Sequence, residues 1–213
     1  IRVRPCSRTL KHTVHLDKVK PERFLLPISK KKTHVIEIHA GQITTTDLTI
    51  SLPPTLNFEP FGGYSKIAAV ERHHNIGKIG VAVAKGYGIR NGAVASSVSH
   101  DSHNIIVIGD NDADMAIAVN EIIRTQGGYT VVENGKVYET LALPIMGLMS
   151  DVGFENVNEA LQRMIQKAHQ MGVAAQIDPF VTLSFLALPV IPELRITPRG
   201  ICKMTAKGPV ILS

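Results

Sequence analysis

A short polar run at residues 96–104 carries the side chains best suited to chemistry. It places His100, Asp101, His103 and several hydroxyl groups between two apolar runs, and we call its residues 99–104 the polar bridge. Imidazoles and carboxylates bind metals or transfer protons near neutral pH. In a strand the two histidines would face opposite ways, whereas in a tight turn they would converge. A turn held by Asp101 and Ser102 hydrogen-bonding the backbone explains the same residues without a function.

Other patterns have simpler explanations. Residues 86–92 (GYGIRNG) come close to a dinucleotide-binding fingerprint, but one residue too many precedes the third glycine and a strand-like run follows. A tight turn between strands explains these glycines better. The acids at residues 110–114 lack the glycine and distal glutamate of a calcium loop, so helix capping accounts for them. His73 and His74 are interpreted as surface histidines in a polar turn.

Motifs that complete an active site are missing from the sequence. It has no H-E-x-x-H, H-x-H or C-x-x-C, and neither a G-x-S-x-G elbow nor a Walker loop. The sequence therefore predicts no metal ligands of its own. Any chemistry of the polar bridge would depend on groups from elsewhere.

Most of the chain is predicted to be β-structure, because runs of β-branched and apolar residues alternate with glycine, proline and polar turns. Only the polar bridge joins two of the runs, so we expect them to form a hairpin. The pair Asn134 and Gly135 predicts a second hairpin. The expected strands are residues 12–16, 34–52 with a turn at 41–42, 67–70, 79–83, 93–98, 105–108, 129–132 and 137–143.

Two helices are predicted among these strands. The first begins at Asp112, which can cap it, and ends at Gly127; the second covers residues 154–173. The tail at residues 179–195 contains two late prolines and is expected to be an extended packed segment. The elements together predict an α+β fold, a layered domain with mostly β-strands and a few packed helices.

Composition narrows the class of protein. The 213 residues are 44% hydrophobic and 19% charged, as in folded soluble proteins. The net charge of +5 is concentrated near the start, and aromatic residues make up 5%, so we expect no nucleic-acid partner. No run approaches the roughly 20 apolar residues of a membrane span. Cys6 and Cys202 lie near opposite ends without a C-x-x-C, which favours a reducing cytoplasm.

Several long strings, in order along residues 66–200, resemble bacterial-type adenine deaminases. They are GAVASSVSHDSHN at 92–104, NDADMA at 111–116, LPIMGLMS at 143–150 and DPFVTLSFLALPVIPEL at 178–194. Ser99 and Asp110 depart from that pattern, since Ala and Thr are expected there. The length and register of these strings make the resemblance far more specific than any single motif.

The resemblance implies a larger enzyme of the amidohydrolase superfamily that acts in purine salvage. Its N-terminal β/α barrel would carry a two-metal site, with manganese or iron, whose activated water hydrolyses adenine to hypoxanthine and ammonia. Its partners would be adenine, its own barrel and further copies of itself in a homo-oligomer. We expect the present chain to be a fragment without the barrel. Residues 1–33 would be a linker or edge segment after that barrel, and residues 34–213 the C-terminal domain.

The resemblance makes the polar bridge the best candidate to reach the active-site mouth of the barrel. His100 or His103 would then hydrogen-bond purine nitrogens, and Asp101 would fix the imidazole tautomer. The alternatives are a non-catalytic structural or oligomerisation module and, on the glycine-rich run alone, a nucleotide-binding protein. Side chains that share an outward concavity would favour catalysis, and side chains bonded only to backbone would favour structure. The candidate catalytic residues are His100, Asp101 and His103, and the candidate substrate-binding residues are Ser97, Ser102 and Asn104.

Overall fold

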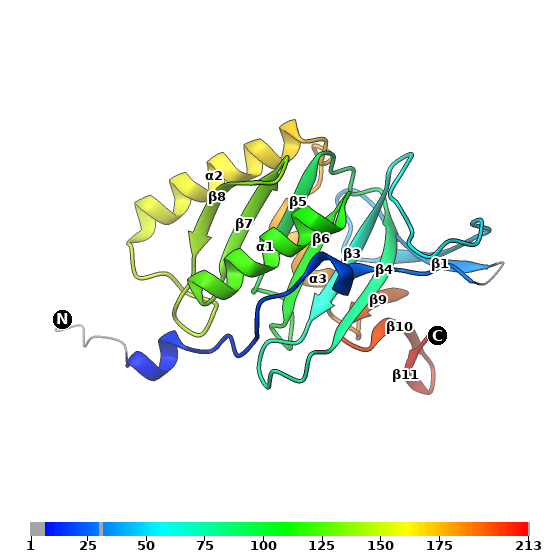
Figure 1. Ribbon diagram of the computed structural model, residues 1–213, viewed down its shortest axis with the longest axis horizontal. Coiled ribbons are helices and arrows are strands. Elements are labelled where there is room, and N and C mark those ends of the chain that lie inside the picture. The colour runs from blue at the N-terminus through cyan, green and yellow to red at the C-terminus, as the bar shows by residue number, and fades with distance from the viewer. Residues whose placement is uncertain (1–6, 30–31, 213) are drawn as a thin grey trace.

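The computed structural model describes residues 7–29 and 32–212, which form an eight-stranded sheet, a three-stranded sheet, three α-helices and two short 3₁₀ helices (Figure 1). The strands of the large sheet are β1 (Thr33–Ile38), β2 (Thr45–Ile50), β3 (Tyr64–Val70), β4 (Ile79–Lys85), β5 (Gly92–Ser96), β6 (Ile105–Gly109), β7 (Gly128–Glu133) and β8 (Lys136–Ala142). The remaining elements are α1 (Asp112–Thr125), α2 (Phe154–Gln170), α3 (Pro179–Leu186), η1 (Arg8–Lys11), η2 (Pro21–Phe24), β9 (Leu194–Thr197), β10 (Gly200–Thr205) and β11 (Gly208–Ile211).

The large sheet has the strand order β2-β1-β4-β3-β6-β5-β7-β8, and the small sheet the order β11-β10-β9. Neighbouring strands are antiparallel except β1 and β4, which run parallel. Both predicted hairpins are confirmed: β5 pairs with β6 across the polar bridge, and β7 pairs with β8 around Asn134 and Gly135. The α+β class predicted from the sequence is thereby confirmed.

The central strands are buried on both faces, which explains why their sequences are apolar without a break. In β6, Ile106 and Ile108 pack in a core with α2 and α3, while Ile105 and Val107 pack in a second core with α1. Figure 1 shows α1 on one face of the sheet and α2 on the other. The strands therefore form a middle layer between two helical layers, and the polar bridge lies at the end of two of its central strands, β5 and β6.

The helix α1 occupies the range predicted for it, but its N-cap differs. Asn111, one residue before the predicted cap Asp112, accepts a hydrogen bond of 2.8 Å from the main-chain N–H of Asp114. The carboxylate of Asp112 instead pairs with Lys66 on β3, with 2.5 Å between Nζ and Oδ1. Asp112 therefore serves as the ion-pair partner of the buried Lys66, and Asn111 caps the helix.

The tail prediction was wrong in its first half. Residues 179–186 form the helix α3, because the Asp178 side chain accepts hydrogen bonds from the N–H groups of Phe180 and Val181. Pro179 stands at the first helical position, where a missing N–H costs nothing. The helix is apolar on nearly all sides, so its sequence shows no helical period. The small sheet β9–β11 that follows was not predicted.

The N-terminal segment packs against the same face as α1. Its residues 12–16 do not form the predicted strand, since their main chain bonds to single groups elsewhere: Val14 N–H to the Gln126 side chain and His15 N–H to the Arg72 carbonyl. Cys202 is a buried free thiol, and Cys6 lies outside the described residues. None of the helices in the described ranges is long and apolar enough to cross a membrane.

Candidate functional site

The polar bridge connects the end of β5 to the start of β6 and rests on α3. The main-chain N–H of His100 donates to the Ser184 carbonyl at 3.1 Å, and its ring lies 5.2 Å from the ring of Phe185, centroid to centroid. The bridge is a turn, so it does not alternate side chains as a strand would. The two histidines are thus free to converge, as the turn alternative predicted.

His100 and His103 do converge. Their ring centroids are 5.7 Å apart with an interplanar angle of 66°. His103 adopts a left-handed backbone conformation, with φ of 48°, and its N–H donates to the Ser99 carbonyl at 2.7 Å. Its Nδ1 accepts the Ser99 N–H at 3.3 Å, which assigns the ring proton of the neutral form to Nε2.

The surroundings of His103 favour its neutral form. Burial and the positive charges of His100, Arg72 and His73 lower the pKa of His103, and only Asp101 acts to raise it. A neutral imidazole with its proton on Nε2 is a hydrogen-bond donor at that atom. His103 is half-buried, so part of this residue remains accessible to solvent.

The remaining polar side chains of the bridge divide into exposed and buried groups. Asp101 and Ser102 are exposed, whereas Asn104 is buried and donates to the Ser102 hydroxyl at 3.0 Å. These three residues line a cavity of about 330 Å³ whose other walls are the residues after α3 and the β9–β10 turn. The cavity therefore joins a polar wall from the bridge to an apolar wall from residues 187–190.

Ser97 lies apart from that cavity. It is fully buried, its hydroxyl donates to the Gly147 carbonyl at 2.6 Å, and the Gly128 N–H donates to it at 2.8 Å. The hydroxyl of Ser99 likewise donates to the Asn104 carbonyl at 2.5 Å. Ser97 thus binds backbone groups of two other segments, whereas Ser99 closes the bridge on itself, and such bonds fix the bridge.

Two residues near the bridge were not among the candidates. His73 Nε2 lies 2.8 Å from the Ser102 carbonyl, and the side chain of Arg72 donates to the His103 carbonyl. Both follow β3, whose last residue Val70 pairs with Ile105 at the start of β6. That register brings residues 71–74 beside the bridge, and only a knowledge of the strand order would have revealed it.

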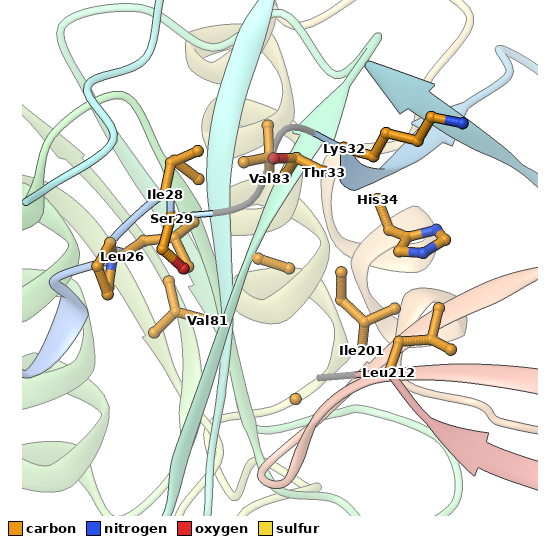
Figure 2. Close-up of a pocket in the computed structure, with 13 residues that line it drawn as sticks. Leu26, Ile28, Ser29, Lys32, Thr33, His34, Val81, Val83, Ile201 and Leu212 are labelled. Atoms are coloured by element: carbon orange, nitrogen blue, oxygen red, sulfur yellow. The ribbon is translucent and has the colours of Figure 1, made fainter. Parts of the chain in front are cut away.

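A second cavity, of about 210 Å³, lies between residues 26–29 and 32–34, β4 and the start of β10 (Figure 2). Its walls are mainly apolar, and His34 stands at its rim with Nδ1 2.7 Å from the carboxylate of Asp47. Lys203 binds the other oxygen of that carboxylate at 2.7 Å. Burial raises the pKa of Asp47, but the bonds from His34 and Lys203 outweigh it and leave the pKa lowered. His34 at this rim is thus part of a paired group with Asp47 and Lys203.

Residues 7–29 and 32–212 contain no group of three or more His, Cys, Asp or Glu side chains that could hold a metal ion. The two histidines of the bridge act as a pair with one exposed carboxylate beside them. Such a group suits hydrogen bonding and proton transfer.

The fold and the bridge define a class: a mixed α/β domain whose open sheet carries a histidine-bearing turn over a short buried helix. Residues 42–207 match the adenine deaminase C-terminal domain. The chain is 46% identical over 202 residues to an adenine deaminase of Desulfitobacterium hafniense (strain Y51), covering 94% of this chain and 36% of that protein. It is 42% identical over 181 residues to an adenine deaminase of Bacillus subtilis (strain 168), covering 84% and 31%.

The chain belongs to the adenine deaminase C-terminal domain family. It spans about a third of the length of these curated relatives and matches only their C-terminal part. The resemblance inferred from the sequence strings is confirmed at the level of the domain.

Proposed function

We propose that this chain is the C-terminal part of an adenine deaminase, which hydrolyses adenine to hypoxanthine and ammonia, and that its polar bridge contacts the substrate. Family membership and the names of the relatives support the reaction. The observation that supports the site is the convergence of His100 and His103, whose ring centroids are 5.7 Å apart, next to the exposed Asp101. Of the candidate residues, Asp101, Ser102 and Asn104 line the cavity of about 330 Å³, whereas His100 and His103 are not among its lining residues.

The chemistry of adenine matches these groups. The neutral His103 would donate its Nε2 proton to a ring nitrogen of the purine, which is an acceptor. Asp101 would accept from the exocyclic amino group or hold the His100 ring in one tautomer. Ser102 and Asn104 would add neutral hydrogen bonds, whereas Ser97 would act only by fixing the bridge. The lowered pKa of His103 keeps that donor uncharged at neutral pH.

The metal that the resemblance implies does not fit the described residues, because they offer no ligand cluster. We therefore assign manganese or iron to an N-terminal barrel of the longer enzyme and derive no step through the metal. Residues 1–33 would follow that barrel, and residues 34–213 would be the domain that covers it. The partners would be the barrel, adenine and other copies of the enzyme in a cytoplasmic homo-oligomer.

A structural or oligomerisation module is the second candidate function. Hydrogen bonds from Ser97 and Ser99 to backbone carbonyls favour it, because they use these two hydroxyls to hold the fold. The exposed apolar side chains of the β8–α2 loop favour it too, since apolar surface often marks an interface. In this alternative the bridge holds the fold and never meets adenine.

A hybrid enzyme distinguishes the two functions. This chain would replace the matching C-terminal part of the Desulfitobacterium hafniense adenine deaminase, and ammonia release from adenine would be measured. We expect an active hybrid whose His103→Ala variant keeps its metal and its oligomeric state but loses most turnover. Full turnover in that variant would support the structural module. A folded, metal-loaded but inactive hybrid would contradict the assignment to adenine deamination.

A further inference from the structure

Arg72 is a buried cation without an acidic partner. Only 2% of its surface is exposed, and none of the ion pairs within the described residues includes it. Burial lowers the pKa of Arg72 to about 10, which still leaves it charged at neutral pH. A buried charge is costly unless its donors are satisfied, so the contacts of this guanidinium require an explanation.

The guanidinium binds three segments that are distant in the sequence. Its Nε donates to the His103 carbonyl in the polar bridge. Its Nη1 donates to the Thr13 carbonyl at 3.1 Å, and its Nη2 donates to the Met146 carbonyl at 3.0 Å. The Arg72 main-chain N–H reaches the Asn104 side chain at 3.4 Å. Arg72 thus joins the bridge to the N-terminal segment and to the loop after β8.

Gly147 makes room for this guanidinium. A Cβ at that position would lie 2.7 Å from Nη1 of Arg72, and the residue has a positive φ of 73° that favours glycine. The same glycine accepts the Ser97 hydroxyl at its carbonyl. The loop after β8 is therefore in contact both with Arg72 and with Ser97, two residues before the bridge.

The orientation of the His103 ring depends on the main chain that Arg72 holds. His103 has a left-handed φ, and its ring is directed by one hydrogen bond to the Ser99 N–H. The carbonyl of the same residue is the acceptor for Arg72. Holding that carbonyl fixes the peptide group that follows the Cα of His103, and the imidazole projects from that Cα. The charge of Arg72 also disfavours a proton on the ring.

We propose that Arg72 is the positioning residue of the candidate site, which fixes the main chain at His103 and so directs its imidazole toward the substrate. This inference rests on the proposed function for its meaning in catalysis. The hydrogen bonds of Arg72 on which it depends, however, all lie within this chain. It can therefore be tested on the 213-residue protein without adenine.

The first test uses nuclear magnetic resonance of the unchanged protein. The Nε–H of Arg72 should exchange slowly with water and show a coupling across the hydrogen bond to the carbonyl carbon of His103. The ring of His103 should be protonated at Nε2 above its pKa. Rapid exchange of the Arg72 proton together with a mixed His103 tautomer would overturn the proposal, whether or not any variant folds.

The second test compares Arg72→Lys and Arg72→Met with Arg195→Lys. Arg195 is a matched control, because it is also buried and its side chain also donates only to hydroxyl and carbonyl oxygens, those of Thr45, Leu194, Ile43 and Pro192. Within the described residues these partners all lie outside the bridge. Both Arg72 variants should lower the exchange protection of the His103 amide by about tenfold or more. Only Arg72→Met should also raise the His103 pKa, since lysine keeps the positive charge.

The outcomes separate this proposal from the proposed function. Unchanged His103 protection, tautomer and pKa in folded Arg72 variants would overturn the positioning role, as would an equal effect of Arg195→Lys. If the spectra change as expected but His103→Ala leaves the turnover of the hybrid enzyme intact, the proposed function fails. In that case Arg72 orients an imidazole that has no part in the reaction.

Discussion

The imidazoles of His100 and His103 meet edge to face, with their ring centroids 5.7 Å apart. A positive charge on His100 at that separation disfavours a proton on the His103 ring. Burial and the charge of His100 lower the pKa of His103 and leave its ring neutral at neutral pH. The pair is therefore suited to donating a hydrogen bond or passing a proton.

The lowered pKa of His103 has a consequence for stability. Its ordinary unfolded value is about 6.5, so the unfolded chain binds the proton first as the pH falls. The free energy of unfolding should therefore decrease as the pH falls from about 6.5 through the lowered pKa. Denaturant titrations across this range measure the slope. His103→Gln should flatten it.

The matched control for that slope is His12→Gln, because His12 is exposed and lies outside the bridge. The control should keep the pH slope of the unchanged protein. Equal slopes for the unchanged protein and His103→Gln would show that His103 titrates alike in the folded and unfolded states.

Lys66 links three segments through a buried ammonium group. It donates to the Phe24 carbonyl at 3.1 Å, to the Asn57 side chain at 2.6 Å and to Asp112 at 2.5 Å. Removing one member of a buried pair leaves the other uncompensated, at a cost of about 3–5 kcal/mol. Asp112→Asn should therefore lower the unfolding free energy by an amount in this range, measured by urea denaturation.

The surface pair of Arg163 and Glu139 provides the comparison for Lys66, since it lies on exposed faces of α2 and β8. Glu139→Gln should change stability little, because water screens such pairs. A loss in Asp112→Asn no larger than in Glu139→Gln would mean that Lys66 is solvated in the folded chain.

The isolated chain should not release ammonia from adenine, even with manganese added. Water is a weak nucleophile at neutral pH unless a metal or an equivalent group activates it, and the described residues contain no ligand cluster. A coupled ammonia assay with the purified 213-residue protein measures this. Robust turnover would show that the active site has been misplaced, because it would then lie within this chain.

An apolar surface should make the isolated chain bind hydrophobic dyes or self-associate. The β8–α2 loop exposes Met146, Met149 and Val152, and Phe154 at the start of α2 is 78% exposed. Phe154→Ser should reduce dye fluorescence, whereas Leu56→Ser in a separate exposed loop should reduce it less. A monomer that binds no dye would count against a partner on this loop.

The sequence predicted the sheet well and the tail poorly, for physical reasons. The bridge is too short for a helical crossover, so the pairing of the strands on either side of it followed from length alone. The helix α3 is buried around most of its surface, so its apolar residues show no period. Its start is nevertheless marked by Asp178 and Pro179, a cap followed by a proline at the first helical position.

The candidate site was predictable only where its residues are close in sequence. His100, Asp101 and His103 share one turn, so a local pattern sufficed to single them out. Arg72 and His73 reach the bridge only through the pairing of β3 with β6, a contact between segments about thirty residues apart. Ser97 was chosen for its hydroxyl, and its burial against Gly147 depends on a loop fifty residues away.

The most direct test of the central claim is kcat/KM for adenine in the hybrid enzyme carrying His103→Ala or His100→Ala. Activity should be normalised to folded, metal-loaded protein, with His12→Ala as the control. Loss of a positioned donor or proton-transfer group should lower kcat/KM by about 10²-fold while metal content stays nearly constant. Unchanged kcat/KM in both variants, with only lowered thermal stability, would contradict the claim that the bridge takes part in catalysis.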